Sequence, residues 1–512
     1  MTAENPSSLF SDLADQEAPR RDAGPPRYVE VERHNIVFEQ FELDRIIGEE
    51  HPARAIWEYV AGLDLGDLYQ RIGARAHTPG RPPPDPRVVL ALWLYACVEG
   101  VGSARELDRL TREHHGFRWL RGGVPVNYHL LSDFRWQAAE VADRLLTESV
   151  ASLSSAGLVN LASLTHDGVR VRASAGAASF RRLETLERSL VEVEERIARL
   201  KQEINDAPDA SQRRLQAARD RAVRERRDRV ATALETARAV AARQAAKEAA
   251  KKAKAPPPDD GTGGRAEMQK VDAVPTTKAP VPNGQEPGAT KADTTGTPSS
   301  DGADAARSEG TVVGAQTQAR KKEPRFSTTD VEAHIMRMPD GGYRPAYNVQ
   351  LTGDLQSGLI VGLGVDTTGS DGGLMAPAMA DVERRFDFLP QRLLADGGYT
   401  ALDDIVAVAR QGITVFCPLK PRRNPNTDPA APRYGDPPEI VDWRRRMVDD
   451  ASAGTAGWMR RRGVHERINA YLRNHGLQRF NVTGSLKIKA VCLLHALAHN
   501  IMAGCRLRAA AA

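Results

Sequence analysis

The chain has few aromatic residues and few cysteines for its length. Phe, Trp and Tyr make up 5% of its 512 residues, while 41% of the residues are hydrophobic, so we expect part of the chain to lie outside a packed core. The four cysteines form no CxxC pair, which argues against a zinc knuckle and against a disulfide framework. They have apolar neighbours and are expected to be reduced core residues: Cys97, Cys417, Cys492 and Cys505.

Long apolar segments are also missing. No apolar run approaches the roughly 18 residues needed to cross a bilayer, and residues 1–21 have no apolar core of the signal-peptide kind. We therefore expect a soluble, cytoplasmic protein with no membrane partner.

Acidic residues are scarce near the C-terminus. The net charge is only +4, but from Thr455 onward we count ten Lys or Arg and a single acid, Glu466. A strongly basic face favours a polyanionic partner such as nucleic acid. The alternative, an ordinary solvated surface, fits one acid among ten bases poorly.

The N-terminal part reads as a polar tail followed by helices. Residues 1–30 are polar and are expected to be disordered, and residues 31–158 are expected to form a helical, DNA-binding domain. Residues 87–100 have the pattern of a buried helix. Ser103 with Glu106 then forms a capping-box signature for the next helix. The outline resembles a helix-turn-helix, although an ordinary helical bundle fits equally well.

The middle of the chain reads as an insertion in two parts. Residues 180–252 are expected to form a coiled-coil helical hairpin, because seven apolar residues follow one another at alternating spacings of three and four. Residues 253–322 are rich in Pro, Gly, Ala, Thr and Asp and are expected to be a disordered tether. The heptad residues are Leu183, Leu186, Leu190, Val193, Ile197, Leu200 and Ile204.

Residues 159–179 and 323–512 together have an α/β pattern. Strands are expected at 160–174, 341–354 and 358–368, followed by a helix near 373–386, a strand near 392–399, a helix near 400–411, a strand at 413–419 and a basic helical region. This order predicts a mixed sheet with flanking helices. The hairpin and the tether then lie between its first and second strands.

Three carboxylates are candidates for chemistry. Asp167 and Asp396 are each expected to end a strand at a DG turn, and ligands of open α/β sheets bind beyond the carboxyl ends of strands. A turn or a helix cap is the alternative for each aspartate. Glu466 lies off the apolar stripe of an amphipathic helix expected within 458–480, so it is either a surface ion-pair partner or a metal ligand.

Three carboxylates suit Mg²⁺, which prefers oxygen ligands and keeps water and substrate phosphates in its shell. Two such ions can assist an in-line phosphoryl displacement, and Mn²⁺ is expected to substitute. Nearby basic side chains would hold the flanking phosphates. The expected DNA-binding residues are Arg461, Arg462, Arg467, Arg473, Lys487 and Lys489.

Several segments together resemble the bacterial insertion-sequence DDE transposases, in the group with a helical N-terminal transposase domain and an RNase H-like catalytic core. The resemblance covers most of the chain outside the insertion. The segments that carry it are VNYHLLSDFR (126–135), HDGVRVRASA (166–175), YNVQLTGD (347–354), LLADGGY (393–399), GVHERINAYLRNHGLQRF (463–480) and KAVCLLHALAHNIM (489–502).

The resemblance implies a role for each acid. Asp167, Asp396 and Glu466 fall on the family's three catalytic, metal-binding carboxylates. Many members carry a Tyr-x2-Arg-x3-Glu-x6-Lys signature, of which Arg462 and Glu466 are kept, while Met459 and Arg473 replace the Tyr and the Lys. Four further residues match recurrent family positions: Tyr347, Asn348, Asp371 and Tyr399.

The family also implies the reaction and its partners. It implies binding of double-stranded DNA at terminal inverted repeats, cleavage that liberates a 3′-hydroxyl, attack of that hydroxyl on target DNA, and a synaptic homodimer. Two alternatives remain at this stage: a general nuclease on the same core, and a non-catalytic DNA-binding protein derived from a transposase.

Overall fold

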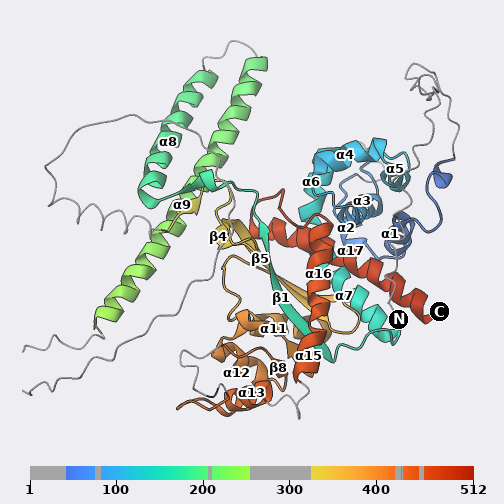
Figure 1. Ribbon diagram of the computed structural model, residues 1–512. Coiled ribbons are helices and arrows are strands. Elements are labelled where there is room, and N and C mark those ends of the chain that lie inside the picture. Colours follow the sequence, from blue (N-terminus) through green and yellow to red (C-terminus); the bar gives the residue numbers. More distant parts are fainter. Residues whose placement is uncertain are drawn as a thin grey trace, which may run out of the picture.

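The computed structural model describes residues 42–74, 82–205, 210–253, 324–420, 428, 430–448 and 455–512. Figure 1 shows a group of helices from the N-terminal part, a sheet with flanking helices, and a long helical hairpin that projects from the sheet. The predicted tail at 1–30 lies outside the described residues, as does the predicted tether beyond Ala253.

The N-terminal helices form a packed bundle around α3. Every residue of α3 from Val88 to Cys97 is buried, as expected for this apolar segment, and the indole nitrogen of Trp93 donates to the carbonyl of Leu131. The helices are η2 (Leu43–Arg45), α1 (Pro52–Ala61), α2 (Gly66–Gln70), α3 (Pro86–Val98), α4 (Ala104–Glu113), α5 (His115–Arg121), α6 (Tyr128–Gln137) and α7 (Ala139–Ser155).

Ser103 caps α4 as predicted. Its hydroxyl accepts from the backbone N–H of Glu106 at 3.4 Å. The Glu106 carboxylate pairs with Arg109, and no bond from it back to Ser103 is found in this helix, so only half of the predicted capping box forms. The DNA-binding role of the bundle stays a prediction.

The sheet is mixed, as the sequence predicted. Its strands are β1 (Ser163–Arg172), β4 (His334–Arg337), β5 (Tyr343–Asp354), β6 (Ile360–Asp366), β7 (Arg392–Leu394) and β8 (Thr414–Phe416). β5 pairs antiparallel with β1, β4 and β6, whereas β7 is parallel to β1 and β8 is parallel to β7. The resulting order, β6-β5-β1-β7-β8 with β4 also on β5, is consistent with an RNase H-like core.

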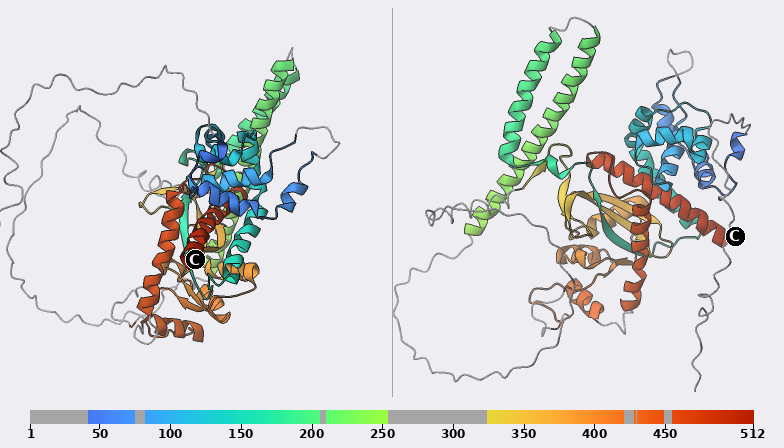
Figure 2. Two further views of the ribbon diagram at one scale, coloured as in Figure 1. Left: turned by 90° about the vertical axis from the view of Figure 1, so that its right-hand side faces the viewer. Right: turned by 45° about the horizontal axis from the view of Figure 1, so that its top comes forward.

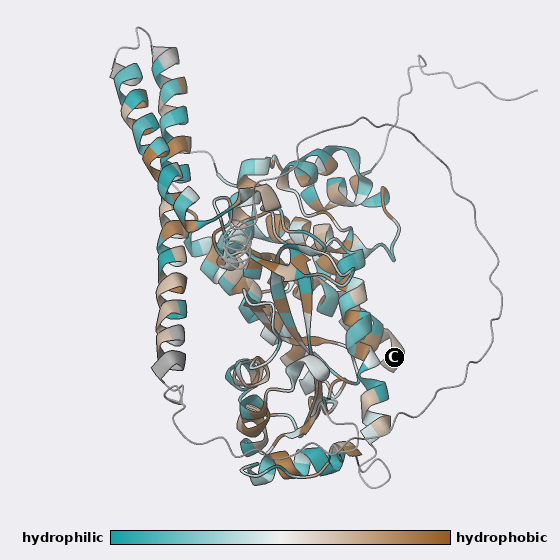
Figure 3. Cartoon of the chain, turned by 60° about the vertical axis from the view of Figure 1, so that its left-hand side comes forward, coloured by the Kyte–Doolittle hydropathy of each residue, from teal (hydrophilic) through white to brown (hydrophobic). Residues whose placement is uncertain are grey.

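The two faces of the sheet are covered by different helices. Leu164 and Leu393 point to one face, where they share a core with α11 (Met375–Phe386), α12 (Leu402–Arg410) and α13 (Pro438–Val448). Val169 and Leu351 point to the other face, where they share a core with α16 (Gly463–Asn474), α17 (Ser485–Ala511) and the N-terminal helices. In Figure 3 the strands carry the hydrophobic colours, whereas the upper part of the hairpin is largely hydrophilic.

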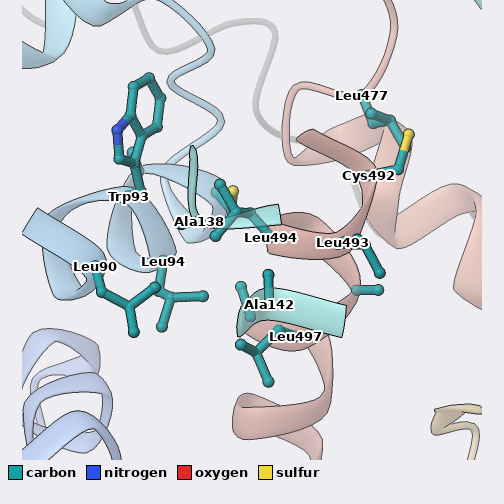
Figure 4. Close-up of a cluster of buried hydrophobic side chains, with 14 of the residues drawn as sticks. Leu90, Trp93, Leu94, Ala138, Ala142, Leu477, Cys492, Leu493, Leu494 and Leu497 are labelled. Atoms are coloured by element: carbon teal, nitrogen blue, oxygen red, sulfur yellow. The ribbon is translucent and has the colours of Figure 1, made fainter. Parts of the chain in front are cut away.

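The helix α17 joins the N-terminal bundle to the sheet. It packs on α3, α7 and β6, and Figure 2 shows it running between these parts. Figure 4 shows its residues Leu493, Leu494 and Leu497 among side chains of α3 and α7. One continuous core therefore connects the bundle and the sheet.

The expectation that no apolar segment is long enough to cross a bilayer was wrong for α17. By length and composition α17 is sufficient to cross a membrane, but 78% of its most apolar window is buried inside the protein. The sequence reading missed it because His495, His499 and Asn500 interrupt the apolar run. Three cysteines are buried and free, and Cys505 is free but partly exposed.

The insertion is closed at its base by a short ladder. β2 (Phe180–Arg181) pairs antiparallel with β3 (Phe326–Ser327), so the residues before and after the insertion meet. Between them lie α8 (Leu183–Asn205) and α9 (Ala210–Ala253), which pack side by side as the predicted hairpin. The helix predicted within 458–480 is instead divided into α15 (Thr455–Arg461) and α16, with a break at Arg462.

Candidate active site

Asp167 lies in the middle of β1, which corrects the expectation that it ends a strand. β1 continues through Asp167, paired with Leu351, and through Gly168, paired with Gln350, as far as Arg172. The DG pair is therefore no turn. Asp167 points to the face covered by α16, because the side chain of Asn469 lies 3.4 Å from its carboxylate.

Glycine is required at position 168 because other side chains approach it closely, and not because the backbone turns there. A Cβ atom at this position would lie 2.5 Å from the side-chain nitrogen of Gln350, 2.7 Å from Asn348 and 2.9 Å from Asp371. Alternation along a strand places Gly168 on the face opposite Asp167. The missing side chain thus lets three polar groups pack directly behind Asp167.

Asp396 follows β7, as the sequence predicted, and begins the 3-10 turn η4 (Gly397–Tyr399). Its carboxylate accepts from the backbone N–H of Gly398 at 2.7 Å, so it also caps a turn. Because β7 is parallel to β1 and stops beside Thr165, Asp396 emerges next to Asp167. Burial, and then the charge of Asp396, raise the pKa of Asp167 to about 6.

Glu466 does not join this pair in the structure. Its side chain is 69% exposed, against 17% for Asp167. The guanidinium of Arg462 lies between them, 3.4 Å from Asp167 and 3.3 Å from Glu466. Glu466 thus forms the i,i+4 surface ion pair that was the alternative to a metal-binding role. In the described ranges, no group of three His, Cys, Asp or Glu side chains is arranged to hold a metal.

A third acid, Asp371, does reach the aspartate pair. A Cβ atom on Gly398 would lie 2.8 Å from a carboxylate oxygen of Asp396 and 3.3 Å from one of Asp371, so both carboxylates converge on that glycine. Asp371 is 14% exposed and pairs with Arg170 at 2.9 Å. The sequence resemblance matched Asp371 to a recurrent family position and assigned it no role.

Asp371 also heads a chain of hydrogen bonds that ends at the Asp396 turn. Its carboxylate accepts from Asn348 at 2.7 Å and from Gln350 at 3.3 Å. The carbonyl of Gln350 accepts from the Tyr399 hydroxyl at 2.6 Å, and Tyr399 is the last residue of η4. These contacts tie β5, the loop after β6 and the turn that carries Asp396 into one polar network.

An arginine-lined cleft lies on the same face as Asp167. It has a volume of about 700 Å³, and Ser163 of β1 contributes to its wall. Ser163 and Asp167 are four residues apart on one strand, which corresponds to about 13 Å. The side chain of Trp458 lies against the guanidinium groups of Arg392 and Arg461. The other arginines that line the cleft are Arg460 and Arg467.

The remaining predicted DNA-binding residues lie elsewhere. Arg473 is exposed in the last turn of α16, where its side chain reaches the carbonyl of Asn469. Lys487 and Lys489 begin α17 and line a second cleft together with Arg71 and Trp136. The structure therefore places Arg461 and Arg467 in one cleft and the two lysines in another.

The residues around Asp167 fit a hard divalent cation. Two adjacent carboxylates, one with a raised pKa, are stabilised by a cation between them. The carbonyl oxygen of Asn469, whose other side-chain atom reaches Asp167, is buried and has no partner among the described residues. Mg²⁺ needs only one or two protein carboxylates when water and substrate phosphates complete its shell, so a pair such as Asp167 and Asp396 has enough carboxylates for such an ion.

Comparison with known families accounts for both parts of the fold. A family described as transposase DDE domain matches residues 323–501, and one described as transposase domain (DUF772) matches residues 41–137. Comparison with curated proteins and with solved structures gives no match. Asp167 lies on β1, outside both matched ranges. β1 is nevertheless the central strand of the sheet whose other strands lie within residues 323–501.

A transposase DDE domain implies an enzyme that cleaves and transfers DNA, and the family uses divalent metal ions. The sheet order, the bundle and both family matches agree with the resemblance seen in the sequence. The chain therefore contains a transposase DDE domain and a helical transposase domain, which share one continuous core.

Proposed function

We propose that this transposase cleaves DNA at the ends of an insertion sequence and transfers the liberated strand to target DNA, using Mg²⁺ or, in its place, Mn²⁺. The proposal rests on the position of Asp396 directly after β7, which brings it beside Asp167 on the neighbouring strand β1. Both carboxylates would hold the divalent ions, which supply charge stabilisation to an in-line displacement at phosphorus.

The reaction has two displacements. In the first, a water oxygen attacks the phosphorus at the element end, and the bond from phosphorus to the 3′-oxygen breaks, so that this oxygen leaves as a hydroxyl. In the second, the same hydroxyl attacks a phosphodiester of the target and displaces its 3′-oxygen. Asp167, on β1, and Asp396, on the turn after β7, would hold the divalent ions next to the reacting phosphate.

The cleft beside Asp167 supports a path for the DNA strand. Arg392, Arg461 and Arg467 are suited to binding the phosphates next to the reacting one, because guanidinium groups bind phosphate oxygens in pairs. In the proposal Arg473, Lys487 and Lys489 contact the duplex further away. The active species is a homodimer that holds two ends, and it acts in the cytoplasm on nucleoid DNA.

Glu466 enters the proposal as a third ligand that is recruited by DNA. In the described conformation Arg462 is shared by Asp167 and Glu466. A DNA phosphate that binds Arg462 would remove this cation from Asp167 and leave Glu466, one helical turn away on α16, free to approach the metal. Arg462 thus links DNA binding to completion of the site.

The test is cleavage by the purified full-length chain with Mg²⁺ or Mn²⁺ on DNA that carries the inverted repeats flanking its gene. Specific nicks with 3′-hydroxyl ends, followed by joining to a plasmid, are the expected result. Asp396→Ala and Asp167→Asn should each abolish both products, whereas the control Asp442→Asn, at an exposed ion pair of α13, should retain them. Full activity of the Asp396 variant would overturn the site assignment.

One observation favours a second candidate, a non-catalytic DNA-binding protein derived from a transposase. This observation is the separation of Glu466 from the aspartate pair. The two candidates differ in metal binding: in the presence of end DNA, the transposase should bind Mn²⁺ in a manner that requires Glu466. End binding without metal uptake or cleavage would favour the second candidate, and equal cleavage of unrelated DNA would indicate a general nuclease.

A further inference from the structure

The apolar stripe of α8 is covered by α9 of the same chain. Leu186, Val193 and Leu200 are each at most 4% exposed. Near the base of the hairpin, Leu186 belongs to one buried cluster with Val230 and Leu234 of α9. Because the heptad seam is filled within one chain, the hairpin does not need a second copy to cover it. The stripe therefore explains how the hairpin holds itself together and leaves open what its outer surface does.

Charge is divided unequally between the two helices. Within α8, residues 183–205 contain six Asp or Glu and four Lys or Arg. Within α9, residues 210–253 contain 13 Lys or Arg and only five acids. A helix that only had to stay soluble would need no such excess of one sign. The excess makes α9 a positively charged rod beside a weakly acidic partner.

Many of the α9 arginines are not neutralised by neighbouring acids. Arg224 pairs with Asp220, and Arg238 pairs with Glu187 of α8. Five others are exposed and make neither a hydrogen bond nor an ion pair within the part of the chain that the structure describes. They are Arg213, Arg219, Arg221, Arg226 and Arg243.

The dimensions of α9 suit a long polyanion. A straight helix of 44 residues is about 66 Å long. Arg219 and Arg226 are seven residues apart, so they point to similar sides at a separation of about 10 Å. Duplex DNA carries one negative charge per roughly 1.7 Å of its axis, so a helix lying along it can meet several phosphates.

The hairpin is joined to the sheet at the end of β1. Its base, the β2–β3 ladder, follows directly after β1, the strand that carries Asp167. Figures 1 and 2 show the hairpin projecting away from the sheet. It lies between the two family matches and in neither of them, so it adds a surface to the transposase unit and does not build its core.

We infer that the hairpin is a sequence-independent binding arm for duplex DNA, and that the exposed arginines of α9 contact the phosphate backbone. The inference rests on the proposed function for the nature of the substrate, but binding by the arm requires neither metal nor cleavage. The arm would hold DNA flanking the reacting phosphate or target DNA, and its contribution to affinity would decrease with salt as phosphate contacts do.

Two matched variants of the full-length chain test this inference. One carries Arg→Gln at Arg213, Arg219, Arg221 and Arg226 of α9. The control removes the same number of positive charges from α8, with Arg188→Gln, Arg196→Gln, Arg199→Gln and Lys201→Gln. Binding of a random-sequence 40-base-pair duplex is measured without metal by fluorescence anisotropy over a range of salt concentrations.

The α9 variant should bind at least tenfold more weakly at low salt. The slope of log K against log salt should fall by about 2 to 4, since each lost phosphate contact contributes roughly 0.9. The α8 variant should change affinity less than threefold. An unchanged slope in the α9 variant, or an equal loss in the α8 variant, would overturn the inference.

Two further measurements separate the possible failures. Asp396→Ala should keep the full salt slope, because binding by the arm requires no cleavage. If the parent chain binds DNA with this slope but does not cleave it, only the proposed function is refuted. Sedimentation should show the same oligomeric state for the α9 variant and the parent chain. If the α9 variant instead dissociates into monomers and binds DNA as before, the surface is a self-association face and the inference is wrong.

Discussion

The candidate active site and the hairpin arm are built in opposite ways. At the sheet, Asp371 accepts from three different side chains, and glycines leave room for the groups that converge there. In the arm, polar contacts are mostly pairs between neighbouring turns, and the basic side chains face solvent. A change at the sheet should therefore disturb many contacts at once, whereas changes on the arm surface should add up one by one.

The same truncation of a buried leucine, made once in each region, should distinguish the two regions most clearly. Leu494 of α17 and Leu186 of α8 are both at most 1% exposed, and a Leu→Ala change at such positions costs about 2–5 kcal/mol. Leu494→Ala should lower the free energy of unfolding of the bundle and the sheet together, because they share that core. Leu186→Ala should open only the hairpin, with rapid hydrogen exchange confined to residues 183–253. Global destabilisation by Leu186→Ala would contradict the separation.

Gly168→Ala should show how little room the sheet site has. The new Cβ would meet Gln350, Asn348 and Asp371 at less than 3.0 Å, and overpacking of this kind costs about 1–3 kcal/mol. Strand cleavage should decrease by more than 100-fold, since the displaced groups hold the Asp396 turn. Gly176→Ala, where nothing lies within 4 Å and the backbone is extended, is the matched control. Single-turnover cleavage and urea unfolding measure both effects, and equal behaviour of the two variants would disprove the crowding argument.

Asp371→Asn should affect the rate more than the fold. The amide keeps one acceptor for Asn348 and Gln350 but loses the charge that pairs with Arg170. We expect kcat for cleavage to fall about tenfold, equivalent to roughly 1.4 kcal/mol, with KM for DNA nearly unchanged. Asp366→Asn, at the end of β6, changes a side chain that accepts only from Thr368 among the described residues, and it should keep kcat. A change in KM alone would show that Asp371 acts in DNA binding instead.

The comparison also shows what the sequence could predict. The succession of the longer strands and the helices along the chain and the presence of the hairpin follow from local periodicity, and the structure confirms them. The role of Gly168 could not be predicted, because a DG pair favours a turn locally and only the neighbouring strand β5 shows that the strand continues. Asp371 was assigned no role for a similar reason: its partners are about 20 to 200 residues away in sequence. The structure keeps Glu466 apart from the aspartate pair because Arg462 contacts both Asp167 and Glu466, and no spacing in the sequence encodes that contact.

The smallest expected difference between the sheet and the arm is in how the stability of each changes between pH 7 and 5. Burial lowers the pKa of His495 from its usual 6.5 to about 4, so the unfolded chain takes up a proton that the folded chain excludes. This group alone should therefore lower the free energy of unfolding as pH falls below about 6.5, by at most about 1.4 kcal/mol per pH unit. His166, His465 and His499, whose pKa values burial also lowers, contribute in the same direction. Asp167 has the opposite sign, because its pKa is raised to about 6 and the folded state gains a proton below that value.

Two substitutions resolve these opposing contributions. His495→Gln should flatten the loss of stability between pH 6.5 and 5, and Asp167→Asn should steepen it, as measured by urea unfolding at half-unit intervals of pH. The arm contains no histidine between residues 183 and 253, so its local opening free energy, measured by hydrogen exchange, should stay level over the same interval. A pH response of the arm that matches that of the sheet would mean that the two regions unfold as one unit, and that the additive behaviour expected of the arm surface does not hold.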